Sequence, residues 1–308
     1  MSLPAAAPAE SRRALAAGIG CYIMWGGMPA LFLLMGHVGA GPWEILGERT
    51  LWALPCALLL VIWARQGDEV RRVLASPRTM AWLVASSILI ATNWTTFVWA
   101  VSRGQTLETS LGYYINPLLN MAVGALFFRE RIHALGLAAI GLAVAGVVLQ
   151  AVALHSVPVV ALVLAFSFGS YGIIRKQVQA SAQTGLFIEC LFMVIPGAAY
   201  VVWLLAHGGG VFGHSLGGSL LMMTAGPATV IPLAMFAWAT RRLPLSTVGF
   251  IQFISPTIGF FVGVEDHEAL TPLSLASFVF IWGGAVLFMV GAWRASRKAA
   301  LVPARANA

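Results

Sequence analysis

The stretch Leu107–Glu130, LETSLGYYINPLLNMAVGALFFRE, is an apolar segment of membrane length with polar residues near its middle. If it enters a bilayer at Leu107, a helical rise of about 1.5 Å per residue places Asn116 and Pro117 about 15 Å deep, near the centre of a hydrocarbon core about 30 Å thick. Proline inside a helix frees a backbone carbonyl and kinks the helix. Lipid tolerates such a break only beside other helices or a water-filled cavity. We therefore expect a membrane protein with a kink at Pro117 and a site between helices at this depth.

The composition of the whole chain is that of a multi-pass membrane protein. Of its 308 residues 59% are hydrophobic and 9% are charged, and the mean hydropathy is +0.87. Soluble domains carry roughly 25% charged residues. The net charge of +7 does not indicate nucleic-acid binding, because the basic residues lie in short hydrophilic breaks, as topology signals do. The three cysteines lie in apolar segments, where we interpret them as small buried hydrophobes.

Apolar runs of about 20 residues predict an all-α integral membrane protein with ten transmembrane helices. The first run is too long for the core of a signal peptide, which has about 7–15 residues. The predicted spans are Ala14–Met35, Trp43–Trp63, Met80–Val101, Thr106–Phe128, Ile132–Leu154, Val157–Ile174, Thr184–Ala206, Ser219–Thr240, Pro244–Val264 and Thr271–Trp293.

The distribution of Lys and Arg between the spans predicts the orientation. With the N-terminus cytoplasmic, all but two of the 18 basic residues fall on the inner side; Arg103 lies outside and Arg49 within a span. Both termini are then cytoplasmic, in a bacterial-type inner membrane. Residues 1–13 form an N-terminal tail and 294–308 a C-terminal tail, with disorder expected for Met1–Arg13 and Ala299–Ala308.

The two halves of the chain resemble each other. Since each half holds five spans, an odd number, the second copy must be inverted in the membrane, as in many secondary transporters. We therefore divide the chain into a first five-helix repeat, 14–154, and a second, inverted repeat, 155–293. At an offset of 139, the residues Phe97, Trp99, Ala100, Arg103, Ile115, Pro117 and Gly124 recur as Phe236, Trp238, Ala239, Arg242, Ile254, Pro256 and Gly263; at 141, Glu48 and Pro55 recur as Glu189 and Pro196.

Six stretches of the chain carry distinctive motifs: Glu44–Trp52, Asn93–Val101, Leu107–Asn120, Leu164–Lys176, Gln183–Glu189 and Leu243–Thr257. These motifs resemble those of RarD-type permeases, which belong to the drug/metabolite transporter (EamA-like) superfamily alongside the YddG-type amino-acid exporters. The resemblance implies a ten-helix inner-membrane carrier that exports metabolites, with amino acids as substrates. One departure is Val264–Glu268, VEDHE, where such proteins end the ninth span with an aromatic residue, Gly and Glu.

Polar and aromatic residues at mid-bilayer depth are the candidate substrate site. Aromatic walls suit an apolar or aromatic side chain, while amides and hydroxyls orient an amino or carboxyl group. The alternative is that these side chains join helices, which contributes only about 0.6 kcal/mol each. The resemblance implies cavity-lining places for Tyr114, Asn116 and Phe168. The full set is Asn93, Trp94, Tyr113, Tyr114, Asn116, Phe168, Tyr171, Gln252 and Ser255, with Pro117 and Pro256 as hinges.

Charges inside the spans form a second set of candidates, as coupling or gate residues. Glu44, Glu48 and Arg49 lie within two helical turns, so a structural ion pair is equally consistent with them. Glu189 occupies the place of Glu48 in the second repeat, and Glu108 begins the fourth span. The outer-loop histidines His207 and His214 and the cluster Glu265–Glu268 have no metal-ligand spacing, so we interpret them as solvated and expect no metal.

The sequence holds neither the GxxxxGK[ST] loop of an ATP-driven pump nor the HExxH motif of a zinc protease. The pattern GxSxG occurs once, at Gly213–Gly217, but in a Gly/His-rich loop between two apolar spans and not on the strand–turn–helix of a serine hydrolase. We expect no enzymatic activity and no cofactor. The partners expected are the lipid bilayer and a small-molecule substrate, with no nucleic acid. The predicted function is export of small metabolites, amino acids including aromatic and neutral ones, by alternating access around a midplane cavity. The alternatives are broad efflux of chloramphenicol-like drugs and a non-transporting receptor or scaffold. Proton-coupled and facilitated transport remain equally consistent with the sequence.

Overall fold

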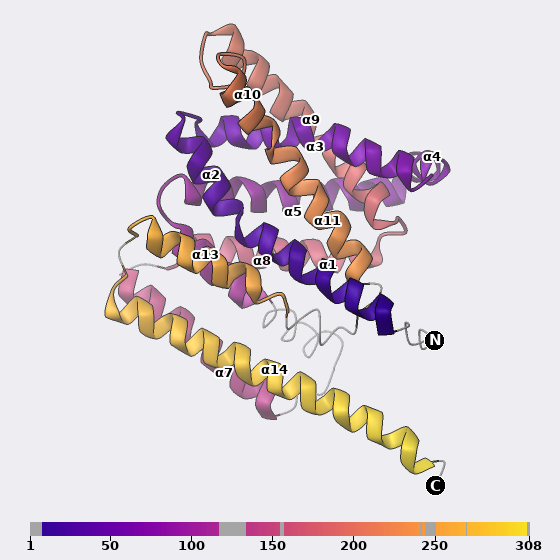
Figure 1. Ribbon diagram of the computed structural model, residues 1–308, viewed down its shortest axis with the longest axis vertical. Helices are drawn as coiled ribbons and strands as arrows, with labels where there is room; N and C mark the ends of the chain where they lie inside the picture. Colours follow the sequence, from indigo (N-terminus) through magenta and orange to yellow (C-terminus); the bar gives the residue numbers. More distant parts are fainter. Residues whose placement is uncertain are drawn as a thin grey trace.

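The computed structural model describes residues 8–116, 134–154, 157–240, 242–243, 251–268 and 270–306, and every regular element in these ranges is an α-helix (Figure 1). Helices satisfy their own backbone donors and acceptors, as lipid requires. Residues 106–116 are also helical. The other helices are α1 (Pro8–Gly26), α2 (Met28–His37), α3 (Pro42–Trp63), α4 (Gly67–Leu74), α5 (Pro77–Val101), α7 (Ala134–Leu154), α8 (Val159–Gln177), α9 (Ala182–Ala206), α10 (Leu216–Met223), α11 (Ala225–Thr240), α13 (Ile254–Glu265) and α14 (Pro272–Ala306).

Within the described ranges, seven helical segments are long and apolar enough to cross a membrane. The other three predicted spans contain shorter described helices, which are residues 106–116, α8 and α13. The chain is therefore an α-helical membrane protein, and the count of ten spans stays a prediction. The seven segments are Arg12–His37, Pro42–Trp63, Pro77–Val101, Ala134–Ala153, Ala182–Ala206, Leu216–Phe236 and Pro272–Gly291.

Two of the predicted spans are broken helices. In the first, Gly27 separates α1 from α2, and Pro29 lies in the first turn of α2, where a missing N–H leaves no hydrogen bond unmade. In the second, Thr224 separates α10 from α11. In transporters, breaks of this kind usually lie next to the transport path.

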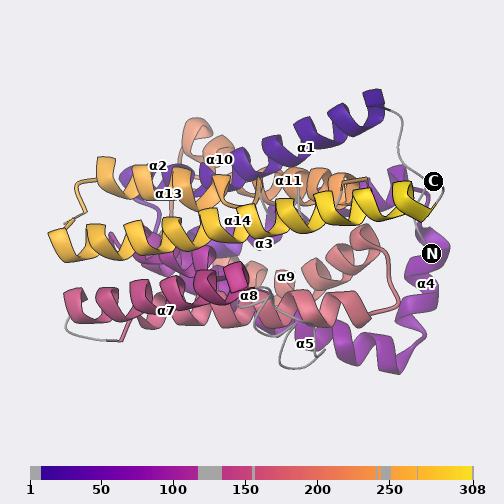
Figure 2. The ribbon, with the colours of Figure 1, turned by 90° about the horizontal axis from the view of Figure 1, so that it is seen from below.

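Helices that are distant in sequence pack as pairs. The closest pairs are α3 with α9, α7 with α14, α1 with α11, and α5 with α8 (Figures 1 and 2). Small residues allow α3 and α9 to approach: a Cβ added to Gly47 would lie 3.1 Å from the carbonyl oxygen of Gly197, and one added to Gly197 would lie 2.0 Å from Thr50 Oγ1. Close backbone approach of this kind is how helices associate in lipid, where the hydrophobic effect does not drive them together.

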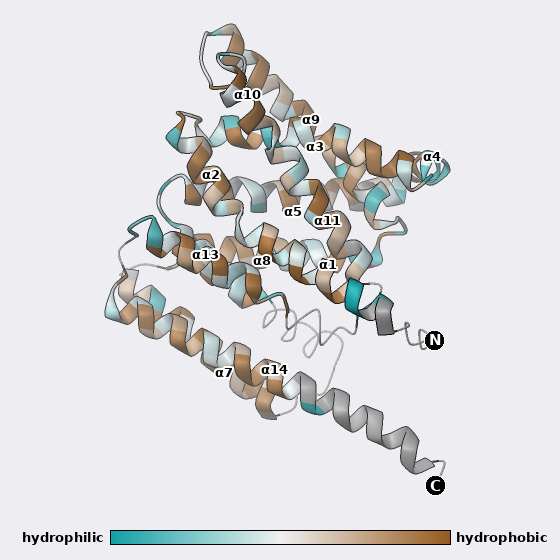
Figure 3. Cartoon of the chain, in the orientation of Figure 1, coloured by the Kyte–Doolittle hydropathy of each residue, from teal (hydrophilic) through white to brown (hydrophobic). Residues whose placement is uncertain are grey.

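The outer surface of the bundle is apolar. Leu59, Ile62, Trp63 and Ile195 are each more than 60% exposed. Hydrophilic residues gather at helix ends, for example along α4 and at the beginning of α1 (Figure 3). An apolar belt of this kind is stable in contact with lipid tails and would promote aggregation in water.

The ends of the chain differ from the disorder that the sequence predicts. Helix α1 already begins at Pro8, and α14 continues to Ala306. The expectation of disorder was therefore wrong for Ala299–Ala306. Four of these eight residues are Ala, the best helix former, and together with Leu301 and Arg305 they extend a helix that is already nucleated, although Pro303 lies among them. The beginning of α1, the end of α14 and α4 lie at the same end of the bundle (Figure 2).

Candidate functional site

A row of ring contacts crosses the interior of the bundle. Phe32 of α2 contacts Phe97 of α5 with centroids 5.9 Å apart, and Phe97 contacts Tyr113 at 5.7 Å. Tyr113 contacts Phe168 of α8 at 6.2 Å, and Phe168 contacts Tyr171 at 6.0 Å. We call these five residues the aromatic row. It brings together three of the predicted site residues, Tyr113, Phe168 and Tyr171, from two separate parts of the chain.

Asn93 of α5 is the polar centre beside this row. Its Nδ2 donates to the carbonyl oxygen of Leu164 and to Ser167 Oγ, both at 3.1 Å, and its Oδ1 accepts from the Tyr113 hydroxyl at 3.1 Å. The side chain is buried, so these bonds replace the water it would otherwise bind. Asn93 thus joins α5, α8 and the helix that begins at Thr106, and it fixes the direction of the Tyr113 ring.

Arg49 of α3 reaches the same region from another side. Its Nε donates to Thr229 Oγ1 of α11 at 2.9 Å. Its guanidinium carbon lies 4.1 Å from the centroid of the Trp94 ring and 5.5 Å from that of Phe32. Trp94 shares an apolar cluster with Phe168 and Tyr171. Arg49 and Trp94 therefore border the aromatic row.

The ion pair that the sequence allowed among Glu44, Glu48 and Arg49 is not formed. Glu48 is fully buried and accepts from Trp52 Nε1 at 2.7 Å. Glu44 accepts from the backbone N–H groups of Val211 and Phe212 in the loop before α10, at 2.6 and 3.1 Å. The reason is geometric, because successive helical residues point about 100° apart.

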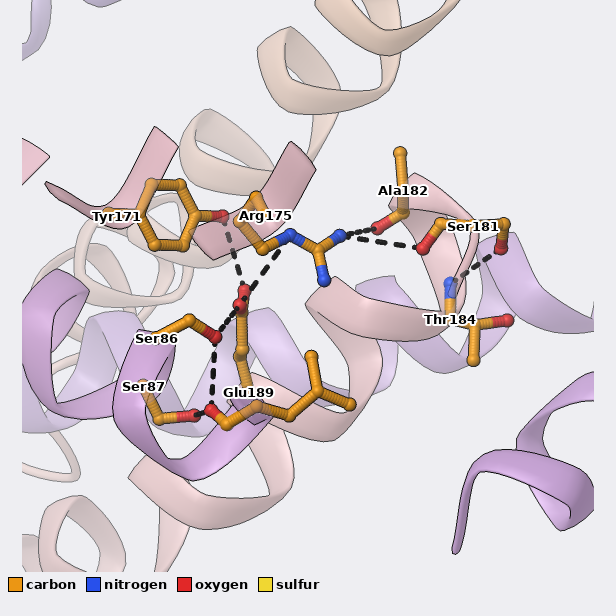
Figure 4. Close-up of polar contacts among 9 residues, drawn as sticks. Ser86, Ser87, Tyr171, Arg175, Ser181, Ala182, Thr184 and Glu189 are labelled. Atoms are coloured by element: carbon orange, nitrogen blue, oxygen red, sulfur yellow. Dashed lines mark hydrogen bonds and ion pairs between the residues drawn. The ribbon is translucent and has the colours of Figure 1, made fainter. Parts of the chain in front are cut away.

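Glu189 of α9 joins three helices near the other end of the row (Figure 4). It accepts from Ser86 Oγ of α5 at 2.6 Å and from the Tyr171 hydroxyl of α8 at 3.2 Å. Arg175 Nε lies 3.7 Å from its Oε1, and Arg175 Nη2 also donates to the carbonyl oxygens of Ser181 and Ala182. The Glu189 side chain is 1% exposed. We call Glu189, Arg175, Ser86 and Tyr171 the Glu189 network; it fastens α5, α8 and α9 together.

Tyr114 and Asn116 do not join the aromatic row. Tyr114 stacks on Phe253, its hydroxyl lies 2.5 Å from that of Thr257, and Trp282 Nε1 donates to it at 2.7 Å. Asn116 is completely buried, and neither polar atom of its side chain has a hydrogen-bond partner among the described residues. Since Tyr113 and Tyr114 are adjacent in a helix, they must face different neighbours.

The remaining predicted residues lie around the beginning of α13. Gln252 is half-buried in a turn just before this helix, and the Ser255 carbonyl oxygen lies 3.0 Å from where a Cβ on Gly26 of α1 would stand. Pro256 is in the first turn of α13, where proline leaves no hydrogen bond unmade. Pro117, the other predicted hinge, lies outside the described residues.

Carboxylates that cap other segments are the feature that sequence reasoning missed. Glu268 accepts from the backbone N–H groups of Thr106 and Leu107 at 2.5 and 2.9 Å, where the helix of residues 106–116 begins. Glu108 accepts from Val160 and Ala161 at the start of α8. Free N–H groups and the positive end of the helix dipole attract carboxylates there. Glu268 belongs to the unusual VEDHE corner, which therefore anchors the start of this helix.

A similar contact lies at the end of the bundle that holds α4. Glu69 of α4 accepts from the Ser181 backbone N–H at 2.7 Å and from the Thr184 hydroxyl at 3.1 Å, at the beginning of α9. Partial burial by itself raises the pKa of Glu69, but the bonds from Ser181 and Thr184 outweigh this and lower the pKa from its usual 4.5. The contact ties α4 to α9.

One hollow adjoins the candidate site. It has a volume of about 420 Å³ and lies between α3, α5 and α9. Trp94 is part of its wall, and so are Gly47 and Thr50, which flank Arg49 along α3. A volume of this size suits a small metabolite. No group of three or more metal-ligating side chains occurs in the described part of the chain.

Comparisons with known proteins identify the family and the fold of the chain. Residues 12–152 match the EamA-like transporter family. A protein of Vibrio cholerae named as an uncharacterized transporter is 39% identical, over 94% of this chain and 96% of its own. Protein RarD of Salmonella typhi is 38% identical, over 94% of this chain and 98% of its own. A solved crystal structure with 16% identity shares the fold, with a TM-score of 0.61 over 91% of this chain and 98% of that chain. The chain therefore belongs to the EamA-like transporters, as a RarD-type permease of the drug/metabolite transporter superfamily, and it is a transporter and not an enzyme.

Proposed function

We propose that this transporter exports small metabolites, and that amino acids with neutral or aromatic side chains are its substrates. The observation that carries the proposal is the aromatic row with Asn93 beside it and Arg49 at its border. Ring faces accept an apolar side chain by shape, while the few polar groups orient the rest of the molecule. At about 1.5 Å per residue, Arg49 is about 10 Å from the beginning of α3 and Asn93 about 12 Å from the end of α5, which are depths inside the hydrocarbon core.

The packing of helix pairs supports the two inverted five-helix repeats. If residues 14–154 and 155–293 are related by a two-fold axis in the membrane plane, α3 is the counterpart of α9 and α7 of α14, and helices that lie next to this axis pack on their own counterparts. The same axis converts the pair α1 with α11 into the pair α8 with α5. All these pairs occur. This symmetry supports ten spans and alternating access, in which one repeat rocks against the other.

The proposed orientation places both termini in the cytoplasm of a bacterial inner membrane. The beginning of α1, the end of α14 and α4 lie at one end of the bundle (Figure 2). That end carries Arg12, Arg13, Arg71 and Arg72, and Lys and Arg favour the cytoplasmic side. The Glu189 network then lies toward the inside and Arg49 toward the outside.

The Glu189 network is the proposed inner gate. Its bonds join α5, α8 and α9, so a path between these helices opens toward the cytoplasm only when they break. Protonation of Glu189 would remove its charge attraction to Arg175, which makes this carboxylate the first candidate for proton coupling. Glu48, its counterpart in the first repeat, accepts one hydrogen bond from the described residues, that of Trp52, and is the second candidate.

Uptake of radiolabelled amino acids into proteoliposomes, with and without an imposed pH gradient, tests the function. We expect flux of phenylalanine and of neutral aliphatic amino acids, reduced at least tenfold by Phe168→Ala. Phe166→Ala is the matched control, because Phe166 lies on the same helix but is 56% exposed on the outer surface. Flux of chloramphenicol without flux of any amino acid would overturn the substrate class in favour of drug efflux. Binding without flux of any compound would refute transport by this site.

A further inference from the structure

Arg49 is a buried cation without a carboxylate partner in the described part of the chain. The ion pairs there involve Arg71, Arg175 and Arg242. Arg49 is 6% exposed; among the described residues it makes one hydrogen bond, through Nε to Thr229, and its Nη1 has no partner. A guanidinium is protonated at all physiological pH values. The described part of the bundle therefore holds a positive charge in its interior without a carboxylate to pair with it.

Such a charge is expensive, because burial removes the water that would stabilise it. The rings of Trp94 and Phe32 offset part of this cost by cation–π attraction. This cation–π attraction does not use the N–H groups of Arg49, because they lie in the plane of the guanidinium. Contacts from α2, α5 and α11 thus hold the guanidinium of Arg49 in place, and its Nη1 stays unpaired among the described residues.

The unpaired Nη1 of Arg49 indicates which kind of acceptor this group can bind. A guanidinium presents its N–H groups in a planar fork that fits the two oxygens of a carboxylate, and such charge-assisted bonds are about twice as strong as neutral ones. Glu44 and Glu48 do not supply that carboxylate in this structure, since neither forms an ion pair with Arg49. Glu44 accepts from the Val211 backbone, and Glu48 accepts from Trp52 through Oε2 while its Oε1 has no partner among the described residues. Arg49 also lies on α3 between Gly47 and Thr50, which line the hollow of about 420 Å³.

We propose that Arg49 is the anion receptor of the transport site and binds the carboxylate of the substrate. The substrate class is then a small monocarboxylate with an apolar or aromatic body, which lies along the aromatic row while its carboxylate bonds to Arg49. This rests on the proposed function, because it names the group of the substrate that this same site recognises. Thr229 is a positioning residue, since it holds Nε and thereby directs the other nitrogens.

A binding assay separates this role from transport. The purified protein in detergent is titrated with L-phenylalanine, L-phenylalaninamide and 3-phenylpropionate, and the ligand-induced rise in melting temperature gives the affinities. The amide keeps the ring and the amine but lacks the carboxylate, whereas the propionate keeps the ring and the carboxylate but lacks the amine. We expect both carboxylates to bind at least tenfold more tightly than the amide.

Variants then assign the preference to Arg49. In Arg49→Met we expect the preference for carboxylates to fall at least tenfold while the ligand-free melting temperature stays the same or rises, because an apolar side chain replaces an unpaired buried charge. Arg49→Lys keeps the charge but loses the planar fork, so we expect partial retention. Arg103→Met is the matched control, since Arg103 also lies over a tryptophan, Trp99, but in an outer turn.

The outcomes separate the two proposals. Equal affinity of the wild-type protein for phenylalanine and its amide, or an unchanged preference in Arg49→Met, would overturn the role of Arg49 even if amino acids are transported. A fall in the ligand-free melting temperature of Arg49→Met with an unchanged preference would show that Arg49 is only structural. Carboxylate binding without amino-acid flux would leave Arg49 as an anion receptor and reject amino-acid export.

Discussion

Gly185 of α9 leaves no room for a side chain beside Arg175, so Gly185→Ala tests the Glu189 network. A Cβ at Gly185 would lie 1.8 Å from Arg175 Nη1 and 2.4 Å from its guanidinium carbon. Both distances are far below contact, so the guanidinium must move by more than 1 Å. Its Nε is already 3.7 Å from Glu189 Oε1, so a shift of that size away from Glu189 ends the ion pair. Gly185→Ala therefore breaks the Arg175 contacts while both charged residues remain.

The expected loss of folding free energy in Gly185→Ala depends on the hydrogen bonds that Glu189 and Arg175 keep. Loss of one partner from a buried ion pair costs about 3–5 kcal/mol. We expect the lower value, because Glu189 keeps its bonds to Ser86 and Tyr171 and because the Arg175 side chain, 14% exposed, can turn toward water. Alanine gains about 1 kcal/mol over glycine in helix propensity. The net loss is about 2 kcal/mol, which corresponds to a fall of roughly 5 °C in melting temperature.

Thermal unfolding of the purified protein in detergent measures this change. The matched control is Gly172→Ala on α8, where an added Cβ meets no atom within 4 Å and the propensity gain alone should raise the melting temperature. In an Arg175→Ala background the obstacle is gone, so Gly185→Ala should no longer destabilise. Equal destabilisation by Gly185→Ala in both backgrounds would refute the reasoning, because the cost would then come from other neighbours of Gly185.

Two further predictions concern the carboxylates that cap helices. Glu268→Ala removes two charge-assisted hydrogen bonds from the helix that begins at Thr106, so we expect it to destabilise the protein by about 1–2 kcal/mol in thermal unfolding. The control is Glu265→Ala, because Glu265 is an exposed carboxylate in the same corner. The pKa of Glu69 is lowered in the folded state, so its contribution is present at neutral pH and is lost as pH falls below its usual pKa of 4.5. The melting-temperature difference between wild type and Glu69→Gln should therefore vanish on acidification; a difference that persists below this range would contradict the assigned bonds.

Much of the candidate site was predictable from residue types and depth. The sequence predicted Asn93, Trp94, Tyr113, Phe168 and Tyr171 as site residues, and the structure places all five together. Amides and rings at mid-bilayer depth can be located by counting residues from the ends of a span. Counting residues does not tell toward which neighbouring helix a side chain points. On depth alone, Tyr114 was therefore grouped with Tyr113, although Tyr114 contacts different helices.

The sequence by itself determined that this is an α-helical membrane protein, because hydropathy is a sum over local sequence. Its motifs pointed to the transporter family. Among the described residues, seven of the ten predicted spans contain helical segments long and apolar enough to cross a membrane. Only the tertiary structure decided which groups meet. Arg49 is bonded to Thr229, 180 residues away, and not to its sequence neighbour Glu48. Glu268 caps a helix that begins 162 residues earlier. Such partners depend on how helices cross and rotate. The crossings are set by close approaches at residues without a side chain, such as Gly47, Gly197 and Gly185, and no local sum contains them.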